Sequence, residues 1–343
     1  MVTIKDVAKK SRTSIRTVSL ILNNKHRENR ISEDTVERVL RIARKLNYRP
    51  SASAISMRTG CFNTVSMILG ATDDPGYSWY PVELLNSISD HLGKHRMNML
   101  LARIADYQLT SEEYLPEVLR EQHSDGFLVN YIVSMPREFF ELVHRCRIPA
   151  VWLNTKLEND CVYSNDIDAG YRAADCLLAK GYRDIGYIGW KIDRVTPHYS
   201  MDERKCGYMS RMEKENLEPR VYLIEDPDFT LPTTPPLTWL KALGFPSAVI
   251  VYKEMDAIRL QCAAAEQGLK VPGDLAIFTF VNSLQSPHIR FPSIEIPFAE
   301  IGRIAVETLL EKIKNPGKLF PPAAVKGRTV SLDLLIPSNP RSR

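Results

Sequence analysis

Two short patterns in this chain of 343 residues have spacings that occur in catalytic or metal sites. His91 and His95 stand four residues apart, which places two imidazoles on one face of a helix where they could bind zinc. No glutamate adjoins them, so the spacing favours an ordinary surface helix. Gly186 and Gly189 follow an expected strand without the rest of a dinucleotide fingerprint, which favours a turn at the strand end. Because a nucleophile elbow and a phosphate-binding loop are also missing from the sequence, we expect no catalytic residue, no metal, no cofactor and no enzyme.

The cysteines and the first residues bear on the cellular compartment. The six cysteines form no Cys-x-x-Cys pair, which argues against a disulfide framework and against a zinc knuckle. Lys5 and Asp6 fall where a signal peptide would have its apolar core, and no apolar run approaches the ~18–20 residues of a membrane span. We therefore expect a cytoplasmic protein with reduced thiols.

The net charge of +4 is unevenly distributed along the chain. The first 60 residues hold 14 Lys and Arg against 5 Asp and Glu, a net charge of +9, whereas the remaining residues hold 31 against 36, a net charge of −5. A basic end of this kind is expected where a protein meets a polyanion. The alternative is a basic face that only contacts solvent.

The basic end has the pattern of three short helices around one small core. The expected helices cover about residues 4–10, 15–23 and 33–46. Thr3, Ser14 and Ser32 stand at the positions of N-caps, and apolar residues recur at helical spacing behind them. The first two helices are joined by about four residues, which predicts a helix-turn-helix.

Three segments of this end resemble the LacI/GalR family of bacterial transcriptional regulators. They are Thr3-Ile4-Lys5-Asp6-Val7-Ala8, Ser14-x-x-Thr17-Val18-Ser19-x-x-Leu22-Asn23 and Leu46-Asn47-Tyr48-Arg49-Pro50. The resemblance implies that the second helix enters the major groove of double-stranded operator DNA. It assigns base contacts to Ile15, Arg16 and Leu20, and phosphate or helix-positioning contacts to Thr3, Ser14, Thr17, Ser19, Asn23 and Arg30.

Arg16 is the sharpest candidate among these residues, because its guanidinium can donate to both O6 and N7 of a guanine, a contact worth ~1–3 kcal/mol of discrimination. The alternative is that Arg16 meets only phosphate. The chain departs from the family at Arg12, where the turn usually holds glycine or a small residue, so we expect a reshaped turn. It departs again at Leu20, which can touch a thymine methyl but cannot make hydrogen bonds to a base.

Residues 50–61 form an expected hinge of small residues after Pro50, either a linker or one and a half helical turns. In the family, the matching segment folds on operator DNA and wedges an apolar side chain into the minor groove. Met57 occupies that position, with Ala54 assigned to the same contact. The alternative is an ordinary linker methionine.

From residue 62 the chain alternates apolar runs with helix-length segments, the pattern of parallel strands buried on both faces. Eight strands are expected, at 64–69, 97–102, 126–129, 150–153, 184–188, 221–224, 248–252 and 275–280. The region resembles the periplasmic-binding-protein fold through matches such as Asn165-Asp166 and Val271-Pro272-Gly273-Asp274. The expected fold class is therefore α/β, an N-terminal three-helix helix-turn-helix domain followed by a body of two doubly wound lobes.

The resemblance also sets the expected domain boundaries. They are 1–49 for the helix-turn-helix domain, 50–61 for the hinge, 62–162 with 291–323 for the first lobe, and 163–290 with 324–343 for the second lobe. A homodimer formed through the body would present two heads to two half-sites of a near-palindromic operator. We therefore expect a cytoplasmic, dimeric repressor.

The resemblance places a small effector between the lobes, and this chain departs from the family there. Arg204 stands at the effector-binding arginine position, and Lys253, at a position where sugar-binding relatives have asparagine, favours an anionic ligand. Asn282 stands where relatives have an acidic residue, next to Val281. Further effector contacts are expected from Tyr77, Trp79 and Tyr80, which could stack on a ring. A sugar, a sugar acid or a sugar phosphate all stay open.

Two rival functions also stay open. One is a small-molecule binding receptor that does not regulate DNA, which would need an export signal and no helix-turn-helix. The other is a regulator whose body binds nothing small and answers to a protein partner.

Overall fold

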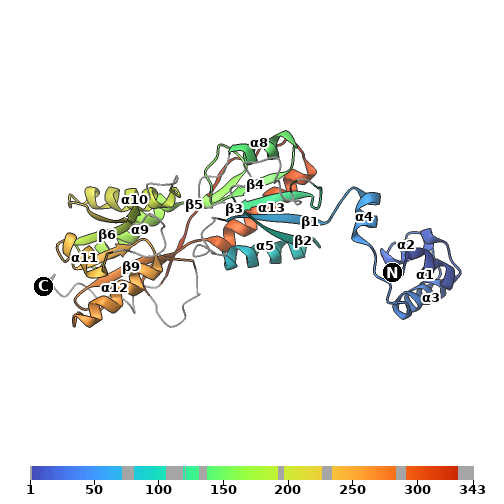
Figure 1. Ribbon diagram of the computed structural model, residues 1–343, viewed down its shortest axis with the longest axis horizontal. Helices are drawn as coiled ribbons and strands as arrows, with labels where there is room; N and C mark the ends of the chain where they lie inside the picture. Colours follow the sequence, from blue (N-terminus) through green and yellow to red (C-terminus); the bar gives the residue numbers. More distant parts are fainter. Residues whose placement is uncertain are drawn as a thin grey trace. The chain divides into compact units, whose positions relative to one another are not determined.

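The structure, a computed structural model, describes residues 2–71, 81–105, 119, 121–130, 137–191, 197–225, 234–282 and 291–330. The chain divides into two units, Met1–Phe62 and Asn63–Arg343. We call them the head and the body, and each is described by itself (Figure 1).

The head contains the three expected helices. They are α1 (Ile4–Ser11), α2 (Ile15–Leu22) and α3 (Glu33–Lys45). One apolar residue pair from each helix is buried in a shared core, namely Val7 and Ala8, Val18 and Ile21, and Val39 and Ala43. The predicted helix-turn-helix domain is therefore confirmed.

The first two helices begin where their caps require. The Thr3 hydroxyl accepts from the backbone N–H of Asp6, and the Asp6 carboxylate accepts from the backbone N–H of Thr3 at 2.8 Å. The backbone and hydroxyl donors of Thr3 also lower the pKa of Asp6. At the second helix, the Ser14 hydroxyl accepts from the backbone N–H of Thr17 at 3.0 Å.

The hinge segment is helical. Helix α4 (Ala52–Thr59) begins at the Ser51 cap, whose hydroxyl accepts from the backbone N–H of Ala54 at 3.3 Å, and it ends at Gly60. Gly60 has a φ of +71°, a left-handed conformation that glycine adopts without steric cost. Of the two expected conformations, the helix is the one found.

The body is built on two six-stranded sheets. The first sheet has the order β11-β5-β4-β3-β1-β2, and the second has the order β12-β10-β9-β8-β6-β7. In the first sheet the strands are β1 (Thr64–Ala71), β2 (Asn98–Ala105), β3 (Gly126–Asn130), β4 (Ala150–Leu153), β5 (Cys161–Ser164) and β11 (Ala323–Val325). In the second sheet they are β6 (Ile185–Lys191), β7 (Arg220–Glu225), β8 (Ala248–Val251), β9 (Ala276–Val281), β10 (Ser293–Glu295) and β12 (Arg328–Val330).

Helices cover both faces of each sheet, as the doubly wound fold requires. On the first sheet, α5 (Val82–Lys94) and α13 (Phe298–Lys314) pack on one face and α8 (Arg137–Arg145) on the other (Figure 1). On the second sheet, α9 (Asp166–Ala179) and α10 (Ser200–Lys214) pack on one face, and α11 (Pro236–Ala242) and α12 (Glu254–Glu266) on the other. We call the two sheets with their helices the first and second lobes.

The eight strands expected from apolar runs are all present, and four short strands were missed. These are β5, β10, β11 and β12, each of three or four residues. Three of them have only three residues, and β5, Cys161-Val162-Tyr163-Ser164, is not a continuous apolar run as the equally short β4 and β8 are. All four form where the chain passes between the lobes. All pairings are parallel except that of β10 with β12.

The strand memberships place the three crossings between lobes later than expected. Strand β5 belongs to the first sheet through Ser164, β10 belongs to the second sheet through Glu295, and β11 belongs to the first sheet through Val325. The expected boundary at 291 had assigned residues 293–295 to the first lobe. Their pairing with β9 puts them in the second sheet instead.

Within the described part of the chain, no helix is both long and apolar enough to cross a bilayer. Nor does that part bring together three or more His, Cys, Asp or Glu side chains in a way that could hold a metal ion.

Candidate functional site

Helix α2 buries one face in the head and leaves the other exposed. Val18 and Ile21 are buried, whereas Ile15 is 46% exposed. Arg16 is exposed, and within the described residues it makes no hydrogen bond and no ion pair. Leu20 is half-buried beside it. The residues expected to contact bases therefore lie on the accessible side of a helix whose orientation the core sets.

The hydroxyls and the amide on α2 mostly satisfy one another. Ser14 lies 2.9 Å from the Thr17 hydroxyl in addition to capping the helix. The Asn23 amide donates to the Ser19 carbonyl at 2.6 Å and to the Ser19 hydroxyl oxygen at 3.3 Å. Such contacts position the helix ends and still leave hydroxyl protons for an outside acceptor.

Two further expected DNA contacts lie in caps and turns of the head. Thr3 is exposed and occupied by its capping contacts with Asp6. Arg30 is exposed and has a φ of +50° in the turn before α3.

The turn between α1 and α2 keeps an ordinary left-handed geometry although its residue is arginine. Arg12 has φ 52° and ψ 46°, and its backbone N–H donates to the carbonyls of Ala8 and Lys9. Arg12 therefore adopts a left-handed conformation that is strained for a non-glycine residue. Whether the turn is reshaped relative to the family stays a prediction.

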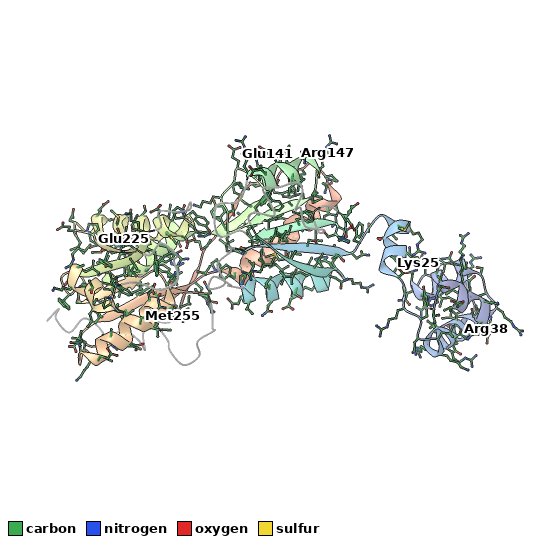
Figure 2. The ribbon with its side chains drawn as sticks, in the orientation of Figure 1. Lys25, Arg38, Glu141, Arg147, Glu225 and Met255 are labelled. Atoms are coloured by element: carbon green, nitrogen blue, oxygen red, sulfur yellow. The ribbon has the colours of Figure 1, made fainter. Side chains whose placement is uncertain are left out.

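On the hinge helix, Met57 is 89% exposed and Ala54 is also exposed. The neighbouring Arg58 reaches α2, where its Nη1 donates to the Ser19 hydroxyl oxygen at 2.5 Å. Figure 2 shows other basic side chains projecting from the head, among them Lys25 and Arg38. Arg38 holds the fold together, because it donates to the Ser11 carbonyl at 3.2 Å and pairs with Asp34 at 2.8 Å.

In the body, Arg204 lies buried on α10 at 5% exposure. Its Nε donates to the carboxylate of Asp166, the first residue of α9, at 2.6 Å, and Asp166 itself is 1% exposed. The guanidinium carbon lies 4.8 Å from the ring centroid of Tyr252 and 4.5 Å from that of Phe280. Burial is the largest single influence and lowers the pKa of Arg204, but Asp166, Tyr252 and Tyr187 together outweigh it, so the pKa lies above its ordinary value. Arg204 therefore carries a charge that the protein already compensates.

Lys253, the second expected cation, is the N-cap residue that precedes α12, and its charge is compensated in another way. Its Nζ lies 3.9 Å from the ring centroid of Trp190. The Trp190 indole donates to Asp256 at 2.7 Å, and Arg259 pairs with the same carboxylate at 2.9 Å. Burial raises the pKa of Asp256, and the Trp190 donor and the Lys253 and Arg259 charges act against that rise.

Asn282 and three aromatic residues are the remaining effector candidates. Asn282 is half-buried directly after β9. Tyr77, Trp79 and Tyr80 lie outside the described residues.

A chain of hydrogen bonds links the first lobe to the second beside Arg204. The Nε2 of His198 lies 2.9 Å from the backbone carbonyl oxygen of Asn154, which follows β4. Its Nδ1 lies 2.7 Å from the Ser200 hydroxyl, which in turn lies 2.8 Å from the hydroxyl of Tyr252. The network therefore ends on a ring that stacks against Arg204.

A second contact between the lobes combines charge and rings. Lys156, beyond β4, pairs with Glu203 of α10. The Lys156 ammonium also lies 4.9 Å and 5.0 Å from the ring centroids of Tyr163 and Tyr199. Burial raises the pKa of Tyr199 well above its ordinary value, so its hydroxyl stays protonated.

Sequence reasoning missed most of these partners of Arg204. The pair Asn165-Asp166 stood in the family pattern, but nothing in the spacing of Asp166 and Arg204 predicts an ion pair. His198 had no motif to mark it, and Tyr252 and Phe280 were placed only as the last residues of two expected strands. Within the described residues, Nδ2 of Asn130 and the Tyr187 hydroxyl are buried without a hydrogen-bond partner, although Oδ1 of Asn130 accepts from the Asn154 amide at 2.5 Å. The unpaired Nδ2 leaves donor capacity at the end of β3.

Comparison with protein families identifies two parts of the chain. Residues 3–51 match the family described as bacterial regulatory proteins, lacI family, and residues 174–330 match the periplasmic binding protein-like domain. Among curated relatives, the ribose operon repressor of Haemophilus influenzae is 28% identical over 327 residues, covering 93% of this chain and 94% of the relative. The HTH-type transcriptional repressor PurR of Actinobacillus pleuropneumoniae is 27% identical over 333 residues, covering 95% of both chains.

Solved structures agree with the fold described above. The Lac repressor dimer bound to operator and the anti-inducer ONPF has a TM-score of 0.76 at 17% identity, covering 98% of this chain and 99% of that one. The transcriptional regulator CelR in its cellobiose complex has a TM-score of 0.61 at 18% identity, covering 96% and 99% of the two chains. The head therefore matches the lacI family of bacterial regulatory proteins over residues 3–51, and the body matches the periplasmic binding protein-like domain over residues 174–330, while repressors at 27–28% identity align with nearly the whole chain.

Proposed function

We propose that this protein is a sequence-specific DNA-binding repressor that acts in the cytoplasm as a homodimer on near-palindromic double-stranded operator DNA. The observation that carries the proposal is Arg16, an exposed cation without a partner in the described chain, on a helix whose other face is held in the head core. A guanidinium so presented can donate to a guanine edge. The relatives support repression, since both are repressors by name. As a regulatory protein of its family, the chain is not an enzyme.

The other contacts follow from exposure and chemistry. Ile15 and Leu20 offer apolar contact to thymine methyl groups, and Met57 is long, apolar and exposed enough to act as a minor-groove wedge. Phosphate or positioning contacts are proposed for Thr3, Ser14, Thr17, Ser19, Asn23, Arg30 and Ala54. These contacts would set the register, and Arg16 would supply the preference for one sequence.

The test is DNA binding by the full chain at several salt concentrations, with a duplex enriched from a random-sequence pool. We expect the logarithm of the association constant to fall linearly with the logarithm of salt, because bound phosphates release counterions. Arg16→Ala should abolish preference for the enriched duplex and keep residual binding to unrelated DNA. Arg41→Ala, which removes an equal charge from the exposed surface of α3, should keep the preference. A salt slope near zero would contradict DNA binding, and an unchanged preference in Arg16→Ala would contradict base readout by that residue.

We infer further that the body binds a small effector, a sugar or a sugar derivative, between the lobes. Arg204, Lys253 and Asn282 are the described candidates, together with Tyr77, Trp79 and Tyr80. Because Asp166 compensates Arg204 and Lys253 lies over Trp190 close to Asp256, neither cation offers a free charge. An anion would have to compete with these internal partners, whereas hydroxyl groups can bind to the polar atoms that stay unpaired. These charges favour the neutral sugars over the sugar acids and phosphates.

A thermal-shift screen of the full chain separates these classes. A ligand at about 100 times its Kd adds about 2.7 kcal/mol of stability, which is a measurable shift. We expect a shift with a neutral sugar. A shift only with sugar acids or phosphates would contradict a neutral-sugar effector. It would support the prediction from the sequence that Arg204 and Lys253 bind an anionic ligand. No shift with any small molecule would favour a protein partner in place of an effector.

A further inference from the structure

A hydrogen bond joins the hinge helix to the recognition helix within the head. Arg58 of α4 donates from Nη1 to the hydroxyl oxygen of Ser19 of α2 at 2.5 Å, across 39 residues of chain. Arg58 is exposed and Ser19 is half-buried. The contact therefore places a hinge cation against the surface of the recognition helix.

Packing does little to hold the hinge helix there. Helix α4 has no buried residue among those described, and Ile55 and Ser56 are only half-buried. An exposed hydrogen bond between a guanidinium and a hydroxyl is weak, because water competes for both groups. The guanidinium therefore gains from a charged acceptor that its remaining N–H groups can reach while Nη1 stays on Ser19.

The chemistry of Ser19 indicates what that acceptor is. Its hydroxyl oxygen accepts from Arg58 at 2.5 Å and from the Asn23 amide at 3.3 Å. A serine oxygen has two lone pairs, so both are engaged, and within the described residues the hydroxyl hydrogen stays available for a further acceptor. Next to that hydrogen lie the remaining N–H groups of the Arg58 guanidinium. Two donors, one of them charged, meet at one exposed point, which suits a phosphate oxygen.

We propose that Ser19 and Arg58 together form a phosphate clamp that holds one DNA phosphate between the recognition helix and the hinge helix. This inference rests on the proposed DNA-binding function and adds Arg58 to the contacts expected for it. The clamp couples the order of the hinge to the docking of the head, because one phosphate satisfies donors from both helices.

The test uses the full chain and the duplex enriched with the wild-type protein, in the salt titration described above. Arg58→Ala should weaken binding several-fold at fixed salt and reduce the log-log salt slope by about one, the contribution of a single phosphate contact. Arg41→Ala, an exposed arginine of α3 outside the clamp, should leave the slope within error of the wild type. Melting of each variant, followed by circular dichroism, checks that the head still folds.

A double-mutant cycle completes the test. Ser19→Ala and Arg58→Ala should weaken binding by less together than the product of their separate effects, because each removes half of the same phosphate site. Equal slopes for Arg58→Ala and Arg41→Ala, or purely multiplicative effects in the cycle, would overturn the clamp while the DNA-binding function stands. A wild-type protein without salt-dependent DNA binding would instead overturn the proposed function, and the clamp with it.

Discussion

The imidazole Nε2 of His198 lies 2.9 Å from the backbone carbonyl oxygen of Asn154, and this contact joins the second lobe to the first. A carbonyl oxygen only accepts, so Nε2 carries the proton and Nδ1 accepts from the Ser200 hydroxyl. The Ser200 oxygen can then accept from Tyr252. The neutral imidazole is therefore the form that satisfies every group in the chain.

The first prediction concerns the pH dependence of this contact. Burial lowers the pKa of His198 below its ordinary value of 6.5, with the nearby Asp166 acting in the opposite direction and Arg204 acting with burial. Because the pKa of His198 is lower in the folded state, the unfolded chain binds a proton more readily as the pH falls below 6.5. The contribution of His198 to stability is therefore complete above pH 6.5 and is lost as the pH falls through the folded-state pKa. The melting temperature of the body should therefore decrease below pH 6.5.

The matched variants assign this decrease to one residue. His198→Gln keeps an N–H donor for the Asn154 carbonyl and cannot titrate, so it should flatten the pH profile in that window. His95→Gln, at the exposed end of α5, should retain the wild-type profile. If His198→Gln follows the wild type, another group causes the pH dependence.

The second prediction concerns the buried ion pair of α9 and α10. Asp166→Asn leaves the Arg204 guanidinium without its counter-charge at 6% side-chain exposure, and it should reduce the free energy of unfolding by ~3–5 kcal/mol. Asp175→Asn removes one partner of Arg211 on the same two helices. Because Asp175 is 52% exposed and Arg211 also pairs with Glu215, we expect a loss of under about 1 kcal/mol. Urea unfolding of both variants measures the difference. Similar losses of unfolding free energy in the two variants would show that burial does not determine how much the pair of Arg204 and Asp166 contributes to stability.

The third prediction concerns the close approach of the same helices. A Cβ on Gly207 would lie 2.2 Å from the Ile167 carbonyl oxygen, and one on Gly170 would lie 2.0 Å from the Arg204 carbonyl oxygen. Gly207→Ala must separate the two backbones, and we expect a loss of roughly 3 kcal/mol or more. Gly93→Ala on α5 meets nothing within 4 Å, so it should stabilise its helix by about 0.5–1 kcal/mol. Thermal melting of both variants measures these changes in stability. A small loss of stability in Gly207→Ala would show that α9 and α10 can move apart at little cost in free energy.

The fourth prediction concerns the strained turn of the head. Arg12 holds φ 52°, a conformation that costs a non-glycine residue roughly 1 kcal/mol. Arg12→Gly should therefore stabilise the head by about 0.5–1 kcal/mol. Arg12→Ala removes the same charge and keeps the strain, so it should give no gain. Denaturation followed by far-UV circular dichroism compares the stability of the two variants. If both change the stability equally, the loss of charge and not the relief of strain is the cause.

Much of this protein could be predicted from its sequence because the determining interactions are local. The Thr3 and Asp6 cap, the Ser14 cap and the apolar spacing on α2 and α3 act within one or two helical turns. The apolar runs of the body each form a strand of four to eight residues, long enough to be recognised without tertiary information. For the same reason, β10 and β12 were missed, since three residues form a strand only when a partner strand is already beside them.

The tertiary structure decided which charges are available for binding. From the sequence, Arg204 and Lys253 are two cations that favour an anionic effector. In the fold, two glycines let α9 and α10 approach until Arg204 meets Asp166, 38 residues away in the chain, while Lys253 lies over Trp190. The sequence by itself determined the types of element, the basic head and the positions of the candidate residues. Whether a buried charge is free or already compensated depends on contacts distant in sequence, and only packing establishes those.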